Sequence, residues 1–214
     1  MRPGALERAL SVLLLVACAL PGRAALAFAG DKPVPDAAGA QPQHHQKHPS
    51  PTIRSQASYP IPDLLMIRDD GRPVSLRQEL DDGDPVVLDF IYTTCTTVCS
   101  VSSQTFAQLQ QLLGARRRSV HLASISIDPE QDTPEHLADY AKKFGAGPNW
   151  RHYTGSPQAS LQAQQAFGVY RGDKMSHNPV TLVRAGPGRD WIRFDGFATA
   201  AQLLQELRSK GAGR

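Results

Sequence analysis

Residues 85–99 read Pro-Val-Val-Leu-Asp-Phe-Ile-Tyr-Thr-Thr-Cys-Thr-Thr-Val-Cys, and this stretch decides the fold. Residues 85–92 are nearly all apolar and rich in β-branched and aromatic side chains, which is typical of a buried central strand. Cys95 and Cys99 follow this strand directly. Apolar residues then recur at helical spacing, at Phe106, Leu109, Leu112 and Leu113. The sequence therefore predicts a cysteine pair between a buried strand and the start of a helix.

The segments around this stretch alternate between strand and helix signals. The predicted elements are, in chain order, a β-hairpin over 64–67 and 73–76, a helical turn over 77–80, a strand over 85–92, a helix after Cys99, a strand over 120–127, helices from Thr133 and Ser156, a second hairpin over 181–184 and 191–195, and a helix over 199–210. This alternation predicts an α/β sheet with helices on both faces. The position of the cysteine pair favours a thioredoxin-like fold with an N-terminal β-hairpin extension.

The N-terminal residues 1–29 have the three parts of a secretory signal peptide. Arg2 and Arg8 are basic, Ala9–Leu20 is an apolar run of 12 residues, and Ala25-Leu26-Ala27 is an A-x-A cleavage site. The apolar run is shorter than the roughly 20 residues that a membrane-spanning helix needs. We therefore expect a folded part outside the cytoplasm, in a bacterial periplasm. Leu15-Val16-Ala17-Cys18 also resembles a lipobox, so lipidation of Cys18 and membrane anchorage remain an alternative to simple cleavage.

Residues 30–58 are poor in large apolar side chains and rich in Pro, Gln, Ala and His, which predicts a flexible linker before a domain over 59–214. His44, His45 and His48 in this linker either collect metal ions or belong to a solvated tether.

The chain has 23 Lys+Arg against 20 Asp+Glu, a net charge of +3, which gives no basic signal for nucleic acid. Its three cysteines are too few for a disulfide-dense scaffold.

The expected position of Cys95 and Cys99 favours reactive thiols. A helix N-terminus offers unpaired N–H groups and positive potential, which favour thiolate over thiol. If the segment is helical, the i, i+4 spacing places both sulfurs on one face, where they can close a disulfide or chelate one soft ion. Thiolate ligands favour Cu(I) and Zn. A purely structural disulfide is the alternative, although closing a five-residue loop gains little stability.

His177, in Met175-Ser176-His177-Asn178-Pro179, is the best candidate for a third ligand, because imidazole suits copper. The alternative is a surface or capping histidine. We interpret His121, His136 and His152 as bystanders. Residues 170–178 form a polar loop, which we expect to become ordered when a metal binds.

Four motifs occur in a fixed order. They are Asp89-Phe90-Ile91-Tyr92-Thr93-Thr94-Cys95 followed by Cys99, then Ser126-Ile127-Asp128-Pro129-Glu130-Gln131-Asp132-Thr133-Pro134, then 150–155, and last His177. This ordered set, across residues from about 60 to 208, resembles the SCO/SenC family, the copper proteins of cytochrome c oxidase assembly.

The resemblance implies a thioredoxin fold with a site for Cu(I), Cu(II) or both made of Cys95, Cys99 and His177. It implies transfer of copper or of reducing equivalents to the oxidase subunit that carries the CuA site, with other copper chaperones or thiol reductants as further partners. The expected protein is thus a copper chaperone more than an enzyme. Asp128 and Asp132 match acidic family positions, and three roles stay open for them: to orient His177, to join a Cu(II) state, or to cap the helix at Thr133.

Two positions depart from the family pattern. Ser100 stands where a proline is usual, and Asn178-Pro179 where small or β-branched residues are common. These departures keep open an alternative function, a thiol–disulfide oxidoreductase that uses Cys95 and Cys99 as a redox-active pair without stable copper. A thiol peroxidase of this fold has Pro seven and Thr three residues before its reactive cysteine. It is disfavoured here, because these positions are Leu88 and Tyr92 before Cys95, and Tyr92 and Thr96 before Cys99.

Overall fold

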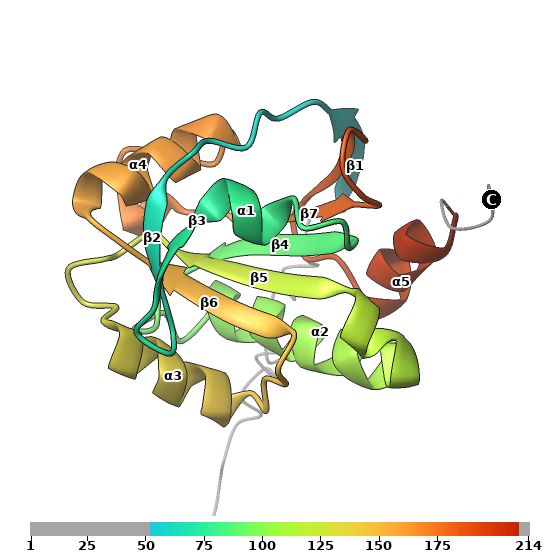
Figure 1. Ribbon diagram of the computed structural model, residues 1–214, viewed down its shortest axis with the longest axis horizontal. Coiled ribbons are helices and arrows are strands. Elements are labelled where there is room, and N and C mark those ends of the chain that lie inside the picture. The colour runs from blue at the N-terminus through green and yellow to red at the C-terminus, as the bar shows by residue number, and fades with distance from the viewer. Residues whose placement is uncertain (1–51, 210–214) are drawn as a thin grey trace, which may run out of the picture. The chain divides into compact units, whose positions relative to one another are not determined.

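The computed structural model describes residues 52–209 (Figure 1). The strands are β1 (Ile53–Ala57), β2 (Leu65–Arg68), β3 (Pro73–Ser75), β4 (Val86–Ile91), β5 (His121–Ser126), β6 (Trp150–Thr154), β7 (Val180–Arg184) and β8 (Trp191–Asp195). The α-helices are α1 (Leu76–Leu80), α2 (Val98–Leu113), α3 (Pro134–Lys143), α4 (Pro157–Ala166) and α5 (Ala200–Ser209), and two short 3₁₀ helices cover Gly114–Ser119 and Lys174–Ser176. Within the described residues, no helix is both long enough and apolar enough to cross a bilayer.

All eight strands form one sheet in the order β1-β8-β7-β4-β5-β6-β2-β3. β4, β5 and β6 run parallel, whereas β7 and β8 are antiparallel to their neighbours. This mixed sheet confirms the predicted α/β class with a thioredoxin-like arrangement. The predicted N-terminal hairpin is β2–β3, and it joins the sheet because β2 pairs with β6.

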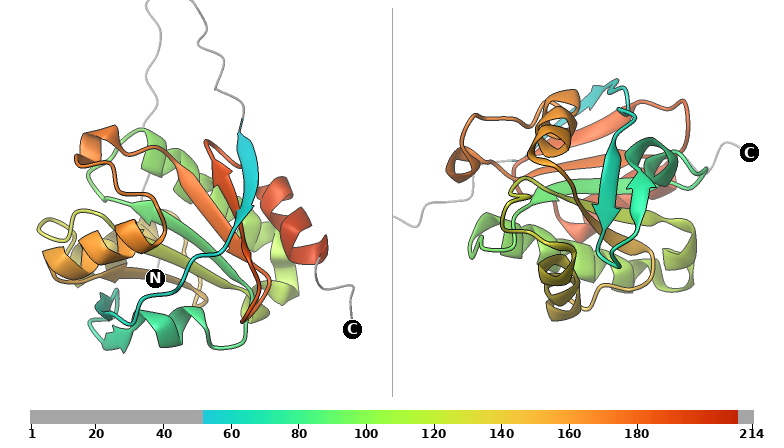
Figure 2. Two further views of the ribbon diagram at one scale, coloured as in Figure 1. Left: turned by 90° about the horizontal axis from the view of Figure 1, so that it is seen from above. Right: turned by 60° about the vertical axis from the view of Figure 1, so that its left-hand side comes forward.

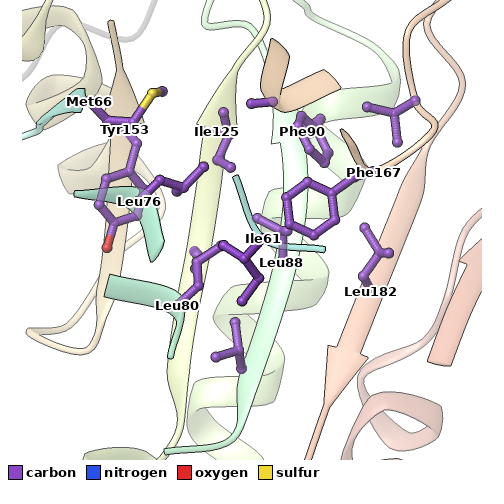
Figure 3. Close-up of a cluster of buried hydrophobic side chains, with 14 of the residues drawn as sticks. Ile61, Met66, Leu76, Leu80, Leu88, Phe90, Ile125, Tyr153, Phe167 and Leu182 are labelled. Carbon is purple, nitrogen blue, oxygen red and sulfur yellow. The ribbon is translucent and has the colours of Figure 1, made fainter. Parts of the chain in front are cut away.

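Helices cover both faces of the sheet, as the sequence predicts. α1 and α4 lie on one face, and α2 and α3 lie on the other (Figures 1 and 2). On the first face, Leu88 and Phe90 of β4 pack with Phe167 in a buried cluster (Figure 3). On the opposite face, Val87 packs in a second cluster with residues of α2 and α5. Because successive side chains of a strand point to opposite faces, β4 must be apolar at nearly every position.

The helix starts are formed by the residues that the sequence indicates. The Thr133 hydroxyl accepts a hydrogen bond from the backbone N–H of His136, and the Ser156 hydroxyl accepts one from that of Ala159. Proline occupies the first turn of both helices. The helix predicted from apolar spacing is α2; of the four residues that carry this spacing, Phe106, Leu109 and Leu113 are buried and Leu112 is 51% exposed.

The predicted linker over 30–58 is wrong at its C-terminal end, because residues 53–57 form β1. This strand pairs with β8 along its whole length, from Ile53 opposite Asp195 to Ala57 opposite Trp191. The side chains of β1 are mostly exposed, and a strand that buries few side chains does not need the apolar pattern by which strands are found in a sequence. Main-chain pairing and polar contacts hold it instead, among them the Arg54–Glu206 ion pair at 2.6 Å. The predicted signal peptide 1–29, Cys18, and His44, His45 and His48 lie outside the described residues.

Candidate metal and thiol centre

The two cysteines lie at the junction between β4 and α2, but they do not share a helical face. α2 begins at Val98 with Thr97 as its N-cap, so Cys99 is in the first turn and Cys95 precedes the helix. The i, i+4 alignment of the two sulfurs was expected only for a helical segment, and this condition is not met. A turn closed by the hydrogen bond from the Cys95 N–H to the Tyr92 carbonyl, 3.1 Å long, brings Cys95 back over the helix end. Both thiols are free and buried.

Cys95 sulfur takes the place of a capping side chain. Thr97 makes no side-chain cap, and the backbone N–H of Cys99 instead donates to Cys95 Sγ over 3.4 Å. Burial raises the pKa of Cys95, but hydrogen bonds from the Cys99 N–H and thiol, the Thr97 N–H and the Tyr92 hydroxyl outweigh it and bring this pKa down to about 7. These hydrogen bonds therefore favour the thiolate form of Cys95 over that of an ordinary cysteine.

Cys99 has the opposite character. Burial raises its pKa far above the ordinary value, and the neighbouring sulfur of Cys95 and the carboxyl of Asp89 raise it further, against one hydrogen bond at Tyr92 that lowers it. In this pair, the Cys95 thiol ionises readily, whereas the Cys99 thiol holds its proton. This asymmetry is suited to thiol–disulfide exchange, in which one thiolate attacks and the second thiol closes the disulfide.

Asp89 is a charged residue inside the buried strand β4. Within the described residues, neither of its carboxylate oxygens has a hydrogen-bond partner. Burial raises the pKa of Asp89 to about 7. The sequence contained a signal for this residue, since Asp89 is the only charged side chain in the run over 85–92.

Asp132 anchors the turn that carries Cys95. Its Oδ1 accepts hydrogen bonds from the Thr93 N–H at 3.1 Å and the Thr93 hydroxyl at 2.6 Å, and its Oδ2 accepts one from the Ser126 hydroxyl at 2.6 Å. Asp132 is fully buried. Because the Thr133 side chain caps α3, Asp132 does not cap that helix, and of its three open roles capping is excluded.

His177 lies at the C-terminal end of the 3₁₀ helix Lys174–Ser176, just before β7. Its Nε2 lies 3.1 Å from the carbonyl oxygen of Phe90. A carbonyl only accepts, so Nε2 carries the proton and Nδ1 retains the lone pair. Burial lowers the pKa of His177, which keeps the ring neutral and able to bind a metal at neutral pH.

Two contacts tie the loop before His177 to its neighbours, one to the loop between β5 and α3 and one to Tyr92 of the cysteine segment. Lys174 Nζ forms an ion pair with Asp128 Oδ2 at 2.6 Å. Met175 Sδ lies 3.9 Å from the Tyr92 hydroxyl, and the Met175 side chain is otherwise largely exposed. A small cavity of about 70 Å³ opens beside His177 and the same loop. Tyr92 and Lys174 were not singled out in the sequence, because nothing in their spacing indicates these partners.

The structure brings Cys95 and Cys99 together but leaves His177 on the Phe90 carbonyl. Across residues 52–209, no three His, Cys, Asp or Glu side chains are grouped closely enough to hold a metal ion. The other described histidines have structural partners. His121 bonds Tyr153 and Glu79, His136 bonds Gln131, and His152 contacts Asp69. A metal bound by all three predicted ligands therefore requires His177 and the cysteine segment to come closer together.

The model of the SCO1/SenC family matches residues 61–209, which include both cysteines, Asp128, Asp132 and His177. The chain belongs to the SCO1/SenC family. It is 32% identical over 111 residues to the SCO1 protein homolog of Bacillus subtilis, covering 51% of this chain and 56% of that protein. It is 30% identical over 99 residues to Protein SenC of Rhodobacter capsulatus, covering 46% and 44%. The chain thus matches about half the length of these curated relatives.

Solved structures of SCO1/SenC relatives share the fold. One is Arabidopsis thaliana ScoI with copper bound, with a TM-score of 0.56, 25% identity, and coverage of 67% of this chain and 92% of that one. Another is BsSco, described with a disulfide switch and as a member of the Sco family of cytochrome c oxidase assembly proteins. Its TM-score is 0.62, with 24% identity and coverage of 76% and 99%.

Ser100 ties the first turn of α2 to the cysteine turn. Its hydroxyl donates to the carbonyl of Cys95 over 3.3 Å, a bond for which a proline at this position would have no donor.

Proposed function

We propose that this protein binds one copper ion through Cys95, Cys99 and His177 and serves the assembly of the CuA site of cytochrome c oxidase. The observation that carries the proposal is the free, buried pair of thiols at the N-terminus of α2, with Cys95 poised to ionise. Thiolates with one imidazole suit copper. Family membership and the copper-bound ScoI relative support this assignment.

Copper binding requires two changes in this chain. Cys99 must release its proton, and Nδ1 of His177, the ring nitrogen that keeps its lone pair, must approach the two sulfurs. Copper would supply the free energy for both, because metal affinity and deprotonation of the ligands are coupled. Cys95 needs little further change, since its pKa is already near neutrality.

The test is a copper(I) titration of the reduced full-length protein in competition with a chelator. We expect one copper per chain, and a weaker site in His177→Ala. Oxidised protein, with Cys95–Cys99 closed, serves as the control and should bind no copper, because a disulfide has no thiolate to donate. Equal affinity of the oxidised and reduced forms would show that the cysteines are not ligands.

A second candidate function is thiol–disulfide reduction of the cysteines of the oxidase. The opposite pKa shifts of Cys95 and Cys99 favour it, because they separate an attacking thiol from a resolving thiol. A Cys99→Ser variant would trap a mixed disulfide between Cys95 and a CuA-site peptide. Stable copper binding without such a trapped species would exclude the reductase function and leave copper binding as the remaining candidate.

We also propose that the mature domain works outside the cytoplasm, on the basis of the signal-like residues 1–29. Cell fractionation and N-terminal sequencing of the mature protein test this. Labelling with a fatty-acid analogue, compared between the wild type and Cys18→Ser, distinguishes lipid anchorage from cleavage after Ala27.

A further inference from the structure

The loop between β5 and α3 contacts both halves of the candidate site. Its turn is closed by the Asp128 carbonyl, which accepts the N–H groups of Gln131 at 3.0 Å and Asp132 at 2.9 Å. The turn places two carboxylates in fixed relation. Asp132 reaches the segment of Cys95, and Asp128 reaches the segment of His177, which lies far away in the sequence.

The contact through Asp132 is rigid. The carboxylate is buried, and it accepts from the Thr93 N–H, the Thr93 hydroxyl and the Ser126 hydroxyl. Thr93 lies two residues before Cys95. Hydrogen bonds to a buried carboxylate are strong, and leaving such a group without donors is costly. This contact therefore fixes the turn in which Cys95 Sγ meets the N–H of Cys99.

The contact through Asp128 is easier to release. Among residues 52–209, its one ion-pair partner is Lys174 Nζ at 2.6 Å, and the lysine side chain is 40% exposed. An ion pair open to solvent adds little stability and is screened by salt. Lys174 is nonetheless well placed to control the histidine, because its carbonyl accepts the N–H of His177 at 3.1 Å.

We propose that the Asp128–Asp132 loop couples the two halves of the site, with Asp132 as the permanent anchor of the thiols and Asp128 as the releasable anchor of the histidine loop. Breaking the Asp128–Lys174 pair frees the loop, so that Nδ1 of His177 can approach the thiols. Both aspartates are positioning residues. The part of this inference that concerns copper rests on the proposed function, whereas the anchoring does not.

The experiment compares Asp132→Asn with Asp128→Asn in the full-length, reduced, metal-free protein. One readout is the pH profile of alkylation of Cys95 by iodoacetamide. The other is amide hydrogen exchange over residues 170–178. Lys174→Met is the matched control, because it removes the same ion pair from the opposite side. Thr93→Val removes one donor to Asp132 while keeping a β-branched side chain, and it replaces Asp132→Asn if that variant does not fold.

We expect Asp132→Asn to slow alkylation at pH 7 about tenfold, because the thiol loses the geometry that favours its thiolate. Asp128→Asn and Lys174→Met should leave that profile within about twofold and speed exchange in the loop several-fold, by amounts that do not add in the double variant. The inference is overturned if Asp132→Asn and Thr93→Val leave Cys95 unchanged, or if the ion-pair variants leave the exchange of the loop unchanged.

The rate of copper(I) uptake by the same variants, measured after mixing with copper, separates this inference from the proposed function. Faster copper uptake by Asp128→Asn and Lys174→Met, with slower uptake by Asp132→Asn, supports the coupling. If no variant and no wild-type protein binds copper, the proposed copper function fails, while the alkylation and exchange results still decide the anchoring. If copper binds equally fast in all of them, the coupling to metal uptake is wrong.

Discussion

The backbone N–H of Cys99 donates a hydrogen bond to the Sγ of Cys95 over 3.4 Å, so the first thiol caps the helix that carries the second. This relationship gives the two cysteines unequal chemistry. The sulfur that receives N–H donors at the helix end is stabilised as a thiolate, while the sulfur inside the first turn is buried against Ile91, Leu137 and Tyr140.

Alkylation of the reduced protein should therefore distinguish the two cysteines. We expect Cys95 to react with iodoacetamide with a midpoint near pH 7, and Cys99 to stay unmodified over the same range. Mass spectrometry of peptides alkylated at several pH values measures both rates, with unfolded protein as the reference for an ordinary thiol. Reaction of both cysteines with one common midpoint would contradict the asymmetry.

Tyr92→Phe should raise the pKa of Cys95, because the Tyr92 hydroxyl is one of the donors that lower it. We expect the pKa of Cys95 to rise by less than about 1, since the N–H groups of Cys99 and Thr97 remain as donors. The ring is retained, so the midpoint of urea unfolding should change little. The same alkylation profile gives the answer, and an unaltered midpoint would mean that the hydroxyl has no part in the thiolate environment.

Asp89→Asn should flatten the pH dependence of stability. Burial raises the folded pKa of Asp89 from 3.8 to about 7, so the folded state holds a proton that the unfolded state releases. The contribution of Asp89 to stability is thus fully present below pH 4 and is lost as the pH rises to about 7, by on the order of 4 kcal/mol.

Urea unfolding at several pH values between 4 and 8 measures this slope. Asp139→Asn is the matched control, because the Asp139 side chain is 75% exposed, and it should keep the wild-type slope. If Asp89→Asn and the wild type lose stability in parallel across this range, the buried carboxyl does not titrate as described.

Removal of β1 should destabilise the domain, whereas removal of a flexible linker would leave its stability unchanged. We compare a chain that starts at residue 52 with one that starts at residue 58. The shorter chain loses the pairing with β8 and the Arg54–Glu206 ion pair, and we expect a cost of roughly 2–4 kcal/mol from several ladder hydrogen bonds worth about 1 kcal/mol each. Denaturant unfolding of both chains would show equal midpoints if residues 53–57 were only a tether.

Elements with strong local signals could be predicted from the sequence alone. The apolar run of β4 and the Ser/Thr-Pro starts of α3 and α4 hold in the structure, because hydrophobic burial and helix capping depend on residues close together in the chain. β1 could not be found in this way. Its exposed side chains carry no pattern, and its pairing depends on the open edge of β8, which lies about 140 residues further along the chain.

The site divides in the same way. The sequence by itself determined that Cys95 and Cys99 lie where a buried strand leads into a helix, and it marked His177, Asp128 and Asp132 as candidates. Only the tertiary structure decided which groups these residues contact. Asp132 accepts a hydrogen bond from Thr93, Asp128 forms an ion pair with Lys174, and His177 donates to the Phe90 carbonyl. Hydrogen bonds and ion pairs between distant segments depend on distance and direction, which sequence spacing does not encode beyond the first few neighbours.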